Sequence, residues 1–235
     1  MTEPKKWNEW DTYMWVVAHP DDAEFSSAGT IARLTASGKK VVIVQVTSGD
    51  KGTPDSSIAG DALANGREVE ERNAADVLGV AEVVYLRCTD GELVPDLTLR
   101  EKIVRQIRAF KPDVVVSHDP YRPYALHPDH RACGFAAIDA VYPTARDPHY
   151  FPQHMEDGLE PHKTAEIWFF NAEQPDLVVD ITETFDTKIA SLREHGSQVG
   201  DGIEMAKRVR ERNAEIAAGQ DFELAEAYKV VEMRR

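Results

Sequence analysis

Cysteine is scarce in this sequence. Only Cys88 and Cys133 are present among 235 residues, too few for a disulfide framework and wrongly patterned for a zinc ribbon. Two reduced thiols are typical of a cytosolic protein. The first residues also lack the apolar stretch of a secretory signal, and no window approaches the roughly 20 apolar residues of a membrane-spanning helix. We therefore expect a cytoplasmic protein that does not associate with membranes.

Positive charge is in short supply as well. Lys and Arg number 27 against 41 Asp and Glu, which gives a formal net charge of -14. The basic residues form no stripe, whereas nucleic acid and anionic membranes both require clustered positive charge. No G-x-G-x-x-G run follows the first predicted strand, which argues against a dinucleotide-binding oxidoreductase. The composition therefore argues against nucleic-acid binding and leaves small-molecule chemistry.

The chain does have a regular alternation of apolar strands and helical segments up to residue 143. Strands are predicted at 13–18, 40–47, 82–86 and 112–118, and helices at 26–38, 62–79 and 98–110. The strands are continuous Val/Ile runs, which indicates that both of their faces are covered. This order predicts an α/β, Rossmann-like fold with a mostly parallel sheet sandwiched between helices.

The alternation stops after residue 143. A segment rich in Pro, His and acids (143–164) is expected to form a long excursion that serves as an interface or a lid. Strands are predicted beyond it at 165–171 and 176–181, and helices at 182–195 and 203–219. Without repeats or a linker, we expect one domain over residues 1–235, with a core at about 13–200 and a charged helix at 200–235. That helix is either a solvated surface or a contact in a homo-oligomer.

Polar residues gather where the first and fourth strands end. "HPDD" (19–22) follows the first strand, and "HPDH" (127–130) comes after the fourth. Ligands of open α/β sheets bind outside the carboxyl ends of the strands, so both clusters are expected at one edge. Two imidazoles and one carboxylate form a common catalytic zinc shell, although other divalent metals accept the same ligands. The residues predict a mononuclear metal site that activates water.

Helix capping is the alternative explanation of these residues. Asp21-x-x-Glu24 fits a capping box, and Pro128 fits the first turn of a helix capped by His127. Capping does not explain why two histidines and a double aspartate meet, so the metal site is the stronger interpretation. The spacing alone leaves open which aspartate and which histidine of "HPDH" bind the metal.

Four segments of the sequence resemble one known family. "AHPDDAEFSSAGTIARL" (18–34) resembles the AHPDDxE signature of the PIG-L/LmbE-like zinc-dependent N-deacetylases, and "HPDH" resembles their second motif. "REVEERNAADVLGV" (67–80) and the stretch from 178 to 199 are similar to two weaker family segments. The resemblance therefore covers about residues 13 to 200.

The resemblance implies roles for individual residues. His19, Asp22 and His130 would hold Zn²⁺, and Asp21 would be the general base that deprotonates water. His127, in its protonated form, would stand beside the developing oxyanion and help the amine to leave.

The resemblance also implies a second group of residues around the reaction centre. Arg67 and Asp90 would bind substrate, although Arg67 is equally well explained as an exposed helix residue. Glu24 would orient a metal ligand, unless it caps the helix.

Two departures from the family pattern concern packing and the pocket. Ala28-Gly29 stands where many members have two glycines, which affects close helix packing. "YRPYAL" (121–126) replaces a glycine-rich run of the thiol-pathway sugar deacetylases, so Tyr121, Arg122 and Tyr124 are expected to reshape the pocket mouth. That difference argues against a GlcNAc-inositol or GlcNAc-malate substrate. His118 and Asp119 are expected to support this loop rather than to bind metal.

The function expected from these observations is hydrolysis of an N-acyl group, most simply acetyl, from an amino sugar or a similar small polar amine. The alternatives are a metal-dependent amidase of a thiol or natural-product conjugate, and a non-catalytic sugar-binding module that keeps the metal site. A phosphoesterase is disfavoured because the chain has no phosphate-cradling glycine loop. The identity of the N-acylated substrate, the metal used in the cell and the oligomeric state are open at the level of sequence.

Overall fold

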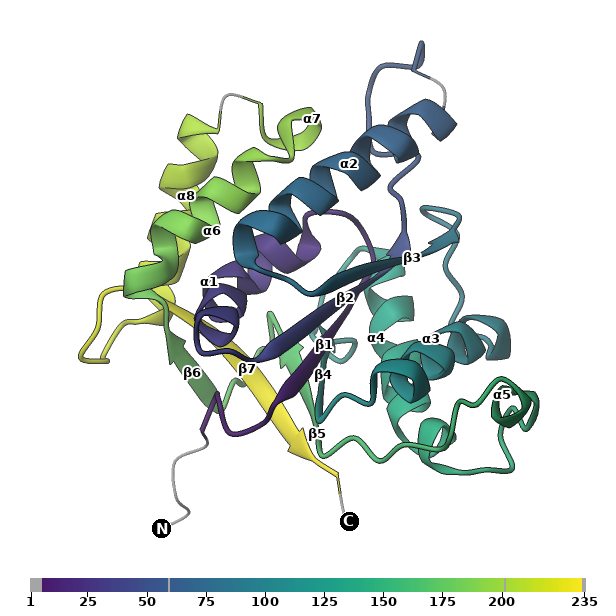
Figure 1. Cartoon of the computed structure of the whole chain (residues 1–235). Helices are drawn as coiled ribbons and strands as arrows, with labels where there is room; N and C mark the ends of the chain where they lie inside the picture. Colours follow the sequence, from purple (N-terminus) through teal and green to yellow (C-terminus); the bar gives the residue numbers. More distant parts are fainter. Residues whose placement is uncertain (1–5, 59, 201, 234–235) are drawn as a thin grey trace.

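The computed structural model of the chain describes residues 6–58, 60–200 and 202–233. Its centre is a seven-stranded sheet (Figure 1). The strands are β1 (Thr12–Val17), β2 (Lys40–Thr47), β3 (Glu82–Cys88), β4 (Val114–His118), β5 (Glu166–Phe170), β6 (Leu177–Asp180) and β7 (Ala225–Glu232). Their order is β3-β2-β1-β4-β5-β7-β6. The first five are parallel, and β7 is antiparallel to both β5 and β6. The predicted α/β fold is confirmed.

Helices cover both faces of the sheet, as the continuous apolar strands predict. One face carries α1 (Asp22–Ala36), α2 (Gly60–Leu78), α6 (Phe185–Arg193) and α8 (Ile203–Ile216), and the other carries α3 (Leu97–Phe110) and α4 (Pro128–Val141) (Figure 1). Successive residues of a strand point to opposite faces. Tyr13 and Trp15 of β1 accordingly lie in the first core, and Met14 and Val16 lie in the second.

The strand order places a topological switch point beside β1. The chain proceeds from β1 outward to β2 and β3, and then returns to the other side of β1 as β4. The connection after β1 therefore leads to one side of the sheet, and the connection after β4 leads to the other. Open α/β sheets bind their ligands at the carboxyl ends of two such strands. Both polar motifs of the sequence follow these two strands.

The carboxyl-terminal part of the chain differs from the prediction. The charged helix expected over 200–235 ends as α8 at Ile216, and β7 then enters the sheet between β5 and β6. β7 places buried Ala225, Tyr228 and Val230 in the core. The prediction was wrong because it continued the charged helix into residues 225–232, whose Tyr and Val residues favour a strand.

The excursion after residue 143 does not cover the switch point. It contains the 3₁₀ turn η1 (Thr144–Arg146) and the short helix α5 (Gln153–Glu156). Buried Arg108 of α3 donates hydrogen bonds to five of its backbone carbonyl groups, those of residues 144, 145, 147, 150 and 151. The imidazole of His162 lies 2.8 Å from the carbonyl oxygen of Pro112, just before β4 begins. The segment is thus held near the amino ends of the strands, away from the switch point, and the expectation of a lid was wrong.

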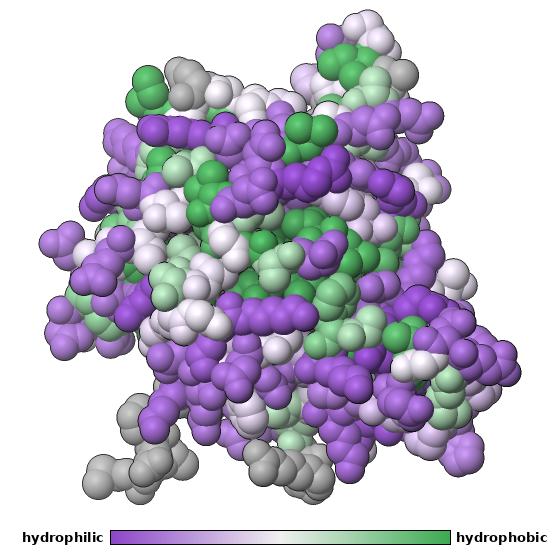
Figure 2. Space-filling view, viewed as in Figure 1, coloured by the Kyte–Doolittle hydropathy of each residue, from purple (hydrophilic) through white to green (hydrophobic). Residues whose placement is uncertain are grey.

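The surface in the view of Figure 1 is mostly hydrophilic. Figure 2 shows apolar residues gathered near its middle, where Figure 1 places the edge strand β3. The side chains of β3 are mostly only half-buried. Among the described residues, no helix is both long and apolar enough to cross a membrane.

A buried ion pair joins the last strand to the first helix. Glu226 of β7 accepts hydrogen bonds from the backbone N–H groups of Gly29 and Thr30 at 3.0 and 2.8 Å. The Nζ atom of Lys188, on α6, lies 2.7 Å from the same carboxylate. A residue with a side chain could not replace Gly29 here without a shift, because its Cβ atom would lie 2.7 Å from the side chain of Ile181. This contact holds α1, and with it the turn that precedes α1, against the sheet.

Glu226→Ala is expected to lower the free energy of unfolding by about 3–5 kcal/mol, because it leaves the Lys188 ammonium buried without a counter-charge. The matched control is Lys229→Ala, which removes a half-exposed ion pair with Asp176 and is expected to cost no more than about 1 kcal/mol. Urea denaturation of both variants measures the difference. Equal losses would contradict this role for the buried pair.

Candidate metal centre

The carboxylate of Asp22 lies among three imidazoles. Its oxygens are 3.4 Å from His19 Nδ1, 3.2 Å from His130 Nε2 and 3.3 Å from His118 Nε2. Asp22 also accepts the backbone N–H of His19 at 2.8 Å, which closes the turn between β1 and α1. The "HPDD" and "HPDH" motifs therefore meet at one edge of the sheet, as predicted.

The far side of the His19 ring faces two acids. His19 Nε2 is 3.1 Å from an oxygen of Asp129 and 3.1 Å from an oxygen of Asp90. A ring nitrogen between two carboxylates carries the proton, so the lone pair of neutral His19 is at Nδ1, on the side of Asp22. Histidine ligands of metals are oriented by an acid or carbonyl in this way.

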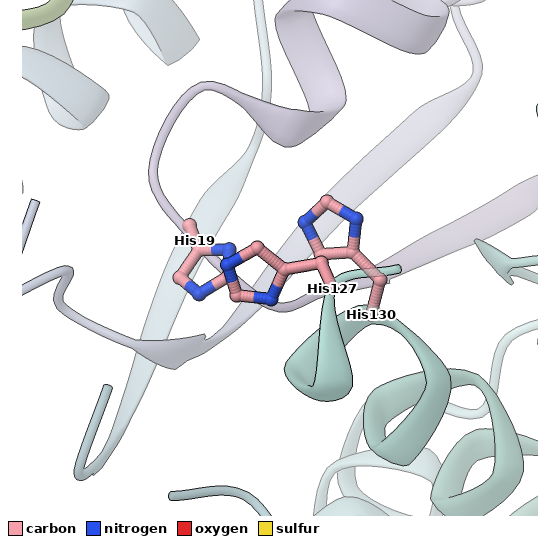
Figure 3. Close-up of side chains that lie close together, drawn as sticks. All are labelled: His19, His127 and His130. Carbon is pink, nitrogen blue, oxygen red and sulfur yellow. The ribbon is translucent and has the colours of Figure 1, made fainter. Parts of the chain in front are cut away.

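The first turn of α4 supplies two more imidazoles. Figure 3 shows His127 and His130 projecting from this turn, with the ring of His127 next to His19. The ring centroids of His127 and His130 lie 4.5 Å apart. His127 is the N-cap of α4, and its Nδ1 accepts the backbone N–H of Asp129 at 3.3 Å. The capping role expected for His127, with Pro128 in the first turn, is confirmed. Because Nδ1 is an acceptor, the neutral ring of His127 carries its proton at Nε2.

His118 supports the cluster from β4. Its Nε2 accepts the backbone N–H of Ala18 at 3.2 Å, which joins the ends of β1 and β4. Its ring stacks on His130 with centroids 4.2 Å apart. Since Ala18 uses the Nε2 lone pair, His118 is suited to hold the neighbouring ring in place. Asp119 accepts the backbone N–H of Tyr121 at 2.9 Å, which is the predicted loop-supporting role.

Charge in this cluster favours a bound cation. Burial alone would raise the pKa of Asp22, but the imidazoles of His118, His130 and His19 hold that pKa well below its usual value. Burial would likewise lower the pKa of His19, but Asp22 and Asp90 raise it to about 10. The site thus stabilises positive charge even without a metal.

The residues present fit a divalent metal. His19 Nδ1 and His130 Nε2 each lie close to the Asp22 carboxylate, at 3.4 and 3.2 Å, and the remaining nitrogen of His19 is oriented by acids. Overlapping groups of these residues lie close enough for their donor atoms to share one ion, namely His19 with His127 and His130, and Asp22 with His118 and His130. Two nitrogens and an oxygen suit Zn²⁺ and several of its rivals.

The side chains of the two adjacent aspartates diverge. Asp21 turns away from the imidazoles, and one of its oxygens lies 3.3 Å from Nη2 of Arg67. Its backbone is left-handed, with φ of 96°. Burial and the nearby Asp22 carboxylate raise the pKa of Asp21 to about 7, although Arg67 opposes that shift.

The capping box proposed for α1 is absent. Asp21 is the N-cap residue, but its side chain makes no capping hydrogen bond. Glu24, expected either to cap α1 or to orient a metal ligand, is fully buried with one oxygen 3.5 Å from His195 Nε2. Glu71 joins this pair, and donor atoms of the three residues lie within 4.8 Å of one another. Sequence reasoning missed the cluster because its members come from three separate elements.

The residues expected to bind substrate lie beside the metal cluster. Asp90 contacts His19, and its other oxygen accepts the backbone N–H of Lys51 at 3.1 Å. Arg67 is 4% exposed, so its alternative description as an exposed helix residue is wrong. It donates to the carbonyl oxygens of Pro20 and Gly49 at 2.6 and 3.3 Å. Both side chains therefore have protein partners.

A pocket of about 550 Å³ lies at the first turn of α1, and no side chain of the metal cluster lines it. It is bounded by Phe25 and Ser26 in the first turn of α1, by the loop after β4, and by α8. Arg122 and Tyr124 line it. Tyr121, however, packs edge-on against Phe135 with ring centroids 5.4 Å apart.

Comparison with known proteins matches this geometry to one group of enzymes. The profile of the family described as "GlcNAc-PI de-N-acetylase", or PIG-L, matches residues 14–141. Diacetylchitobiose deacetylase of Thermococcus kodakarensis is 36% identical over 196 residues, which cover 83% of this chain and 73% of the relative. A 1D-myo-inositol 2-acetamido-2-deoxy-alpha-D-glucopyranoside deacetylase of Saccharopolyspora erythraea is 31% identical over 78% of this chain and 76% of its own length.

A solved structure is similar over nearly the whole chain. N,N'-diacetylchitobiose deacetylase from Pyrococcus horikoshii has a TM-score of 0.91 at 30% identity, and the match covers 96% of this chain and 85% of that one. The similarity therefore extends well beyond residues 14–141, which the family profile matches.

Asp129→Ala is expected to weaken Zn²⁺ binding by roughly 10–100-fold, because Asp129 orients His19 from behind. The same carboxylate accepts the backbone N–H groups of Gly91 and Leu93. Asp119→Ala is the control, since it removes an acid of the loop before α4 that accepts the Tyr121 N–H. Competition with a chelating dye measures both affinities. An unchanged affinity in Asp129→Ala would rule out this orienting role.

Proposed function

The chain belongs to the PIG-L family, and from this premise we propose that it is a Zn²⁺-dependent hydrolase that removes the acetyl group from an N-acetylated amino sugar. The observation that carries the proposal is the Asp22 carboxylate between His19 Nδ1 and His130 Nε2, with Asp21 directly beside it and turned away. The names of the relatives support the reaction and the class of substrate, since they are deacetylases of diacetylchitobiose and of a GlcNAc-inositol compound.

His19, Asp22 and His130 are proposed to hold the metal. A bound Zn²⁺ supplies Lewis-acid polarisation of the amide carbonyl and makes water more acidic at neutral pH. Asp129 and Asp90 keep the proton of His19 at Nε2 and leave Nδ1 free for the metal. His118 keeps the His130 ring in place by stacking on it.

Two residues of the chain are proposed to carry the proton transfers. Asp21 is the base that takes a proton from the attacking water, and it returns this proton to the leaving nitrogen as the C–N bond breaks. The products are the protonated amine and acetate, so one water is consumed for each bond cleaved. His127 is proposed to donate its Nε2–H to the carbonyl oxygen, where negative charge develops.

The neutral ring of His127 suits this role better than the protonated ring first expected. Its Nδ1 already accepts the Asp129 N–H, and burial, together with the nearby His19 and His130 rings, lowers the pKa of His127. A neutral Nε2–H still provides the hydrogen bond.

The amine part of the substrate is proposed to extend into the pocket beside α1. This pocket joins the first turn of α1 to Arg122, Tyr124 and α8. Asp90 lies next to His19 at the cluster, where it is proposed to accept a sugar hydroxyl. Because Arg122 and Tyr124 form part of the pocket wall, the proposed substrate is an amine other than GlcNAc-inositol or GlcNAc-malate.

The test of the function is metal content together with acetate release. Protein purified without added metal is expected to carry about one Zn²⁺ per chain and to release acetate from at least one of a panel of N-acetylated amino sugars, including diacetylchitobiose. Removal of the metal by a chelator should abolish release, and added Zn²⁺ should restore it. Bound metal with no release from any of these compounds would favour another acyl group or a binding module. Failure to bind metal after reconstitution would overturn the proposal.

Asp21→Asn is expected to keep the metal and to lower kcat by roughly 10²–10⁴-fold, since an amide cannot accept the proton of water. His130→Ala is the contrasting variant, because it removes a proposed ligand and should lose the metal itself. Metal analysis and steady-state rates on the same preparations separate the two effects. Loss of metal in Asp21→Asn would make Asp21 a ligand, and full occupancy in His130→Ala would remove His130 from the ligand set.

A further inference from the structure

One peptide group next to the metal centre has both of its polar ends bonded to the same helix. The carbonyl oxygen of Pro20 accepts a hydrogen bond from Arg67 Nη2 at 2.6 Å. The N–H of the same peptide group, which belongs to Asp21, donates to Glu71 Oε2 at 3.3 Å. Arg67 and Glu71 are four residues apart on α2, so they lie on one face of the helix.

We propose that Arg67 and Glu71 are positioning residues, which clamp the Pro20–Asp21 peptide group and thereby aim the Asp21 carboxylate at the attacking water. The inference rests on the proposed function, in which Asp21 is the base. It assigns to Glu71 a role in the reaction without contact to substrate or metal. It also assigns to Arg67 a role other than the substrate contact expected from the sequence.

The backbone of Asp21 needs such a clamp. Its φ of 96° is unfavourable for a residue with a side chain, and strain of this kind persists only where the surroundings impose it. Rotation of the peptide group would break the bonds to Arg67 and Glu71 together. Both partners are buried, with exposures of 4% and 0%, so water could not replace the lost bonds cheaply.

The surroundings of Arg67 are shaped for contact with the backbone. Its guanidinium passes so close to Gly49 that a Cβ atom there would lie 2.1 Å from Nη1. Gly49 in turn offers its carbonyl oxygen to Nη1 at 3.3 Å. The missing side chain at Gly49 therefore opens the path by which Arg67 reaches Pro20 and Asp21.

Two further buried residues lie close to Glu71. Its Oε1 has no hydrogen-bond partner among the described residues, and it belongs to the cluster with Glu24 and His195. Glu24 is on α1, and His195 lies between α6 and the short helix α7 (Gly196–Val199). The helix α2, which carries both residues of the clamp, packs against α1 and α6, and this packing supports the Asp21 turn.

The test compares Glu71→Met, which cannot accept the Asp21 N–H, with Glu71→Gln, which keeps an acceptor oxygen. Asp76→Met controls for the loss of a carboxylate from α2, because Asp76 is exposed. Bound Zn²⁺, kcat and KM for an acetylated amino sugar, and the amide hydrogen exchange of Asp21 are measured for each variant. The exchange measurement needs no turnover, so it tests the clamp even if the proposed function fails.

Glu71→Met is expected to bind one Zn²⁺, to keep its KM and to lose up to roughly 10²-fold in kcat, as misplaced catalytic groups do. The Asp21 N–H should lose its protection against exchange. Glu71→Gln and Asp76→Met should match the wild type in all four quantities.

Three results would overturn the proposal. They are a wild-type kcat in folded Glu71→Met, a change confined to KM, and unchanged protection of the Asp21 N–H. For Arg67, a rise in KM alone in Arg67→Lys would mark a substrate contact, whereas a fall in kcat at constant KM supports the clamp.

Discussion

The rest of this site depends on the contacts between the Asp22 carboxylate and the imidazoles around it. It closes the turn after β1 through the His19 N–H, and it lies within 3.4 Å of imidazoles that come from the end of β1, the end of β4 and the start of α4. Three histidines around one buried acid are a stable arrangement only if positive charge is present, as a proton or as a metal. The affinity for a cation and the local fold therefore have the same physical origin.

The topology explains why these residues meet. β1 and β4 are neighbours in space although about a hundred residues separate them, because the chain builds β2 and β3 on one side before it returns. Ala18 and His118, at the two strand ends, are joined by a hydrogen bond across this switch point. α4 then begins at Pro128, which directs both histidines of its first turn back towards β1. The residues with proposed catalytic roles are thus fixed by strand ends and one helix start.

Much of this could be predicted from the sequence, and the failures have a common cause. Strand ends, the Pro128 start of α4 and the divergence of Asp21 from Asp22 are local properties, and each was predictable from a few neighbouring residues. The support of His19 by Asp129, 110 residues away, and the contact of Glu71 with Asp21 depend on packing between distant elements. β7 was missed for a related reason, since its place between β5 and β6 is fixed by pairing partners and not by its own periodicity.

The residues proposed for the reaction and those proposed for the choice of substrate also differ in this way: the first come from local motifs, and the second from distant elements. The metal cluster is built from two short motifs whose residue types follow from the chemistry. The pocket at the first turn of α1 is also lined by the loop at residues 122–124, by α8 and by Ala227 of β7. None of these three parts carries a comparable motif. Substitutions there change the shape and charge of the pocket without touching Asp22 or its imidazoles. Under the proposed function, one metal centre would serve different N-acetylated amines. The carboxyl-terminal strand and helix, although remote in sequence, would then belong to the part of the protein that selects among them.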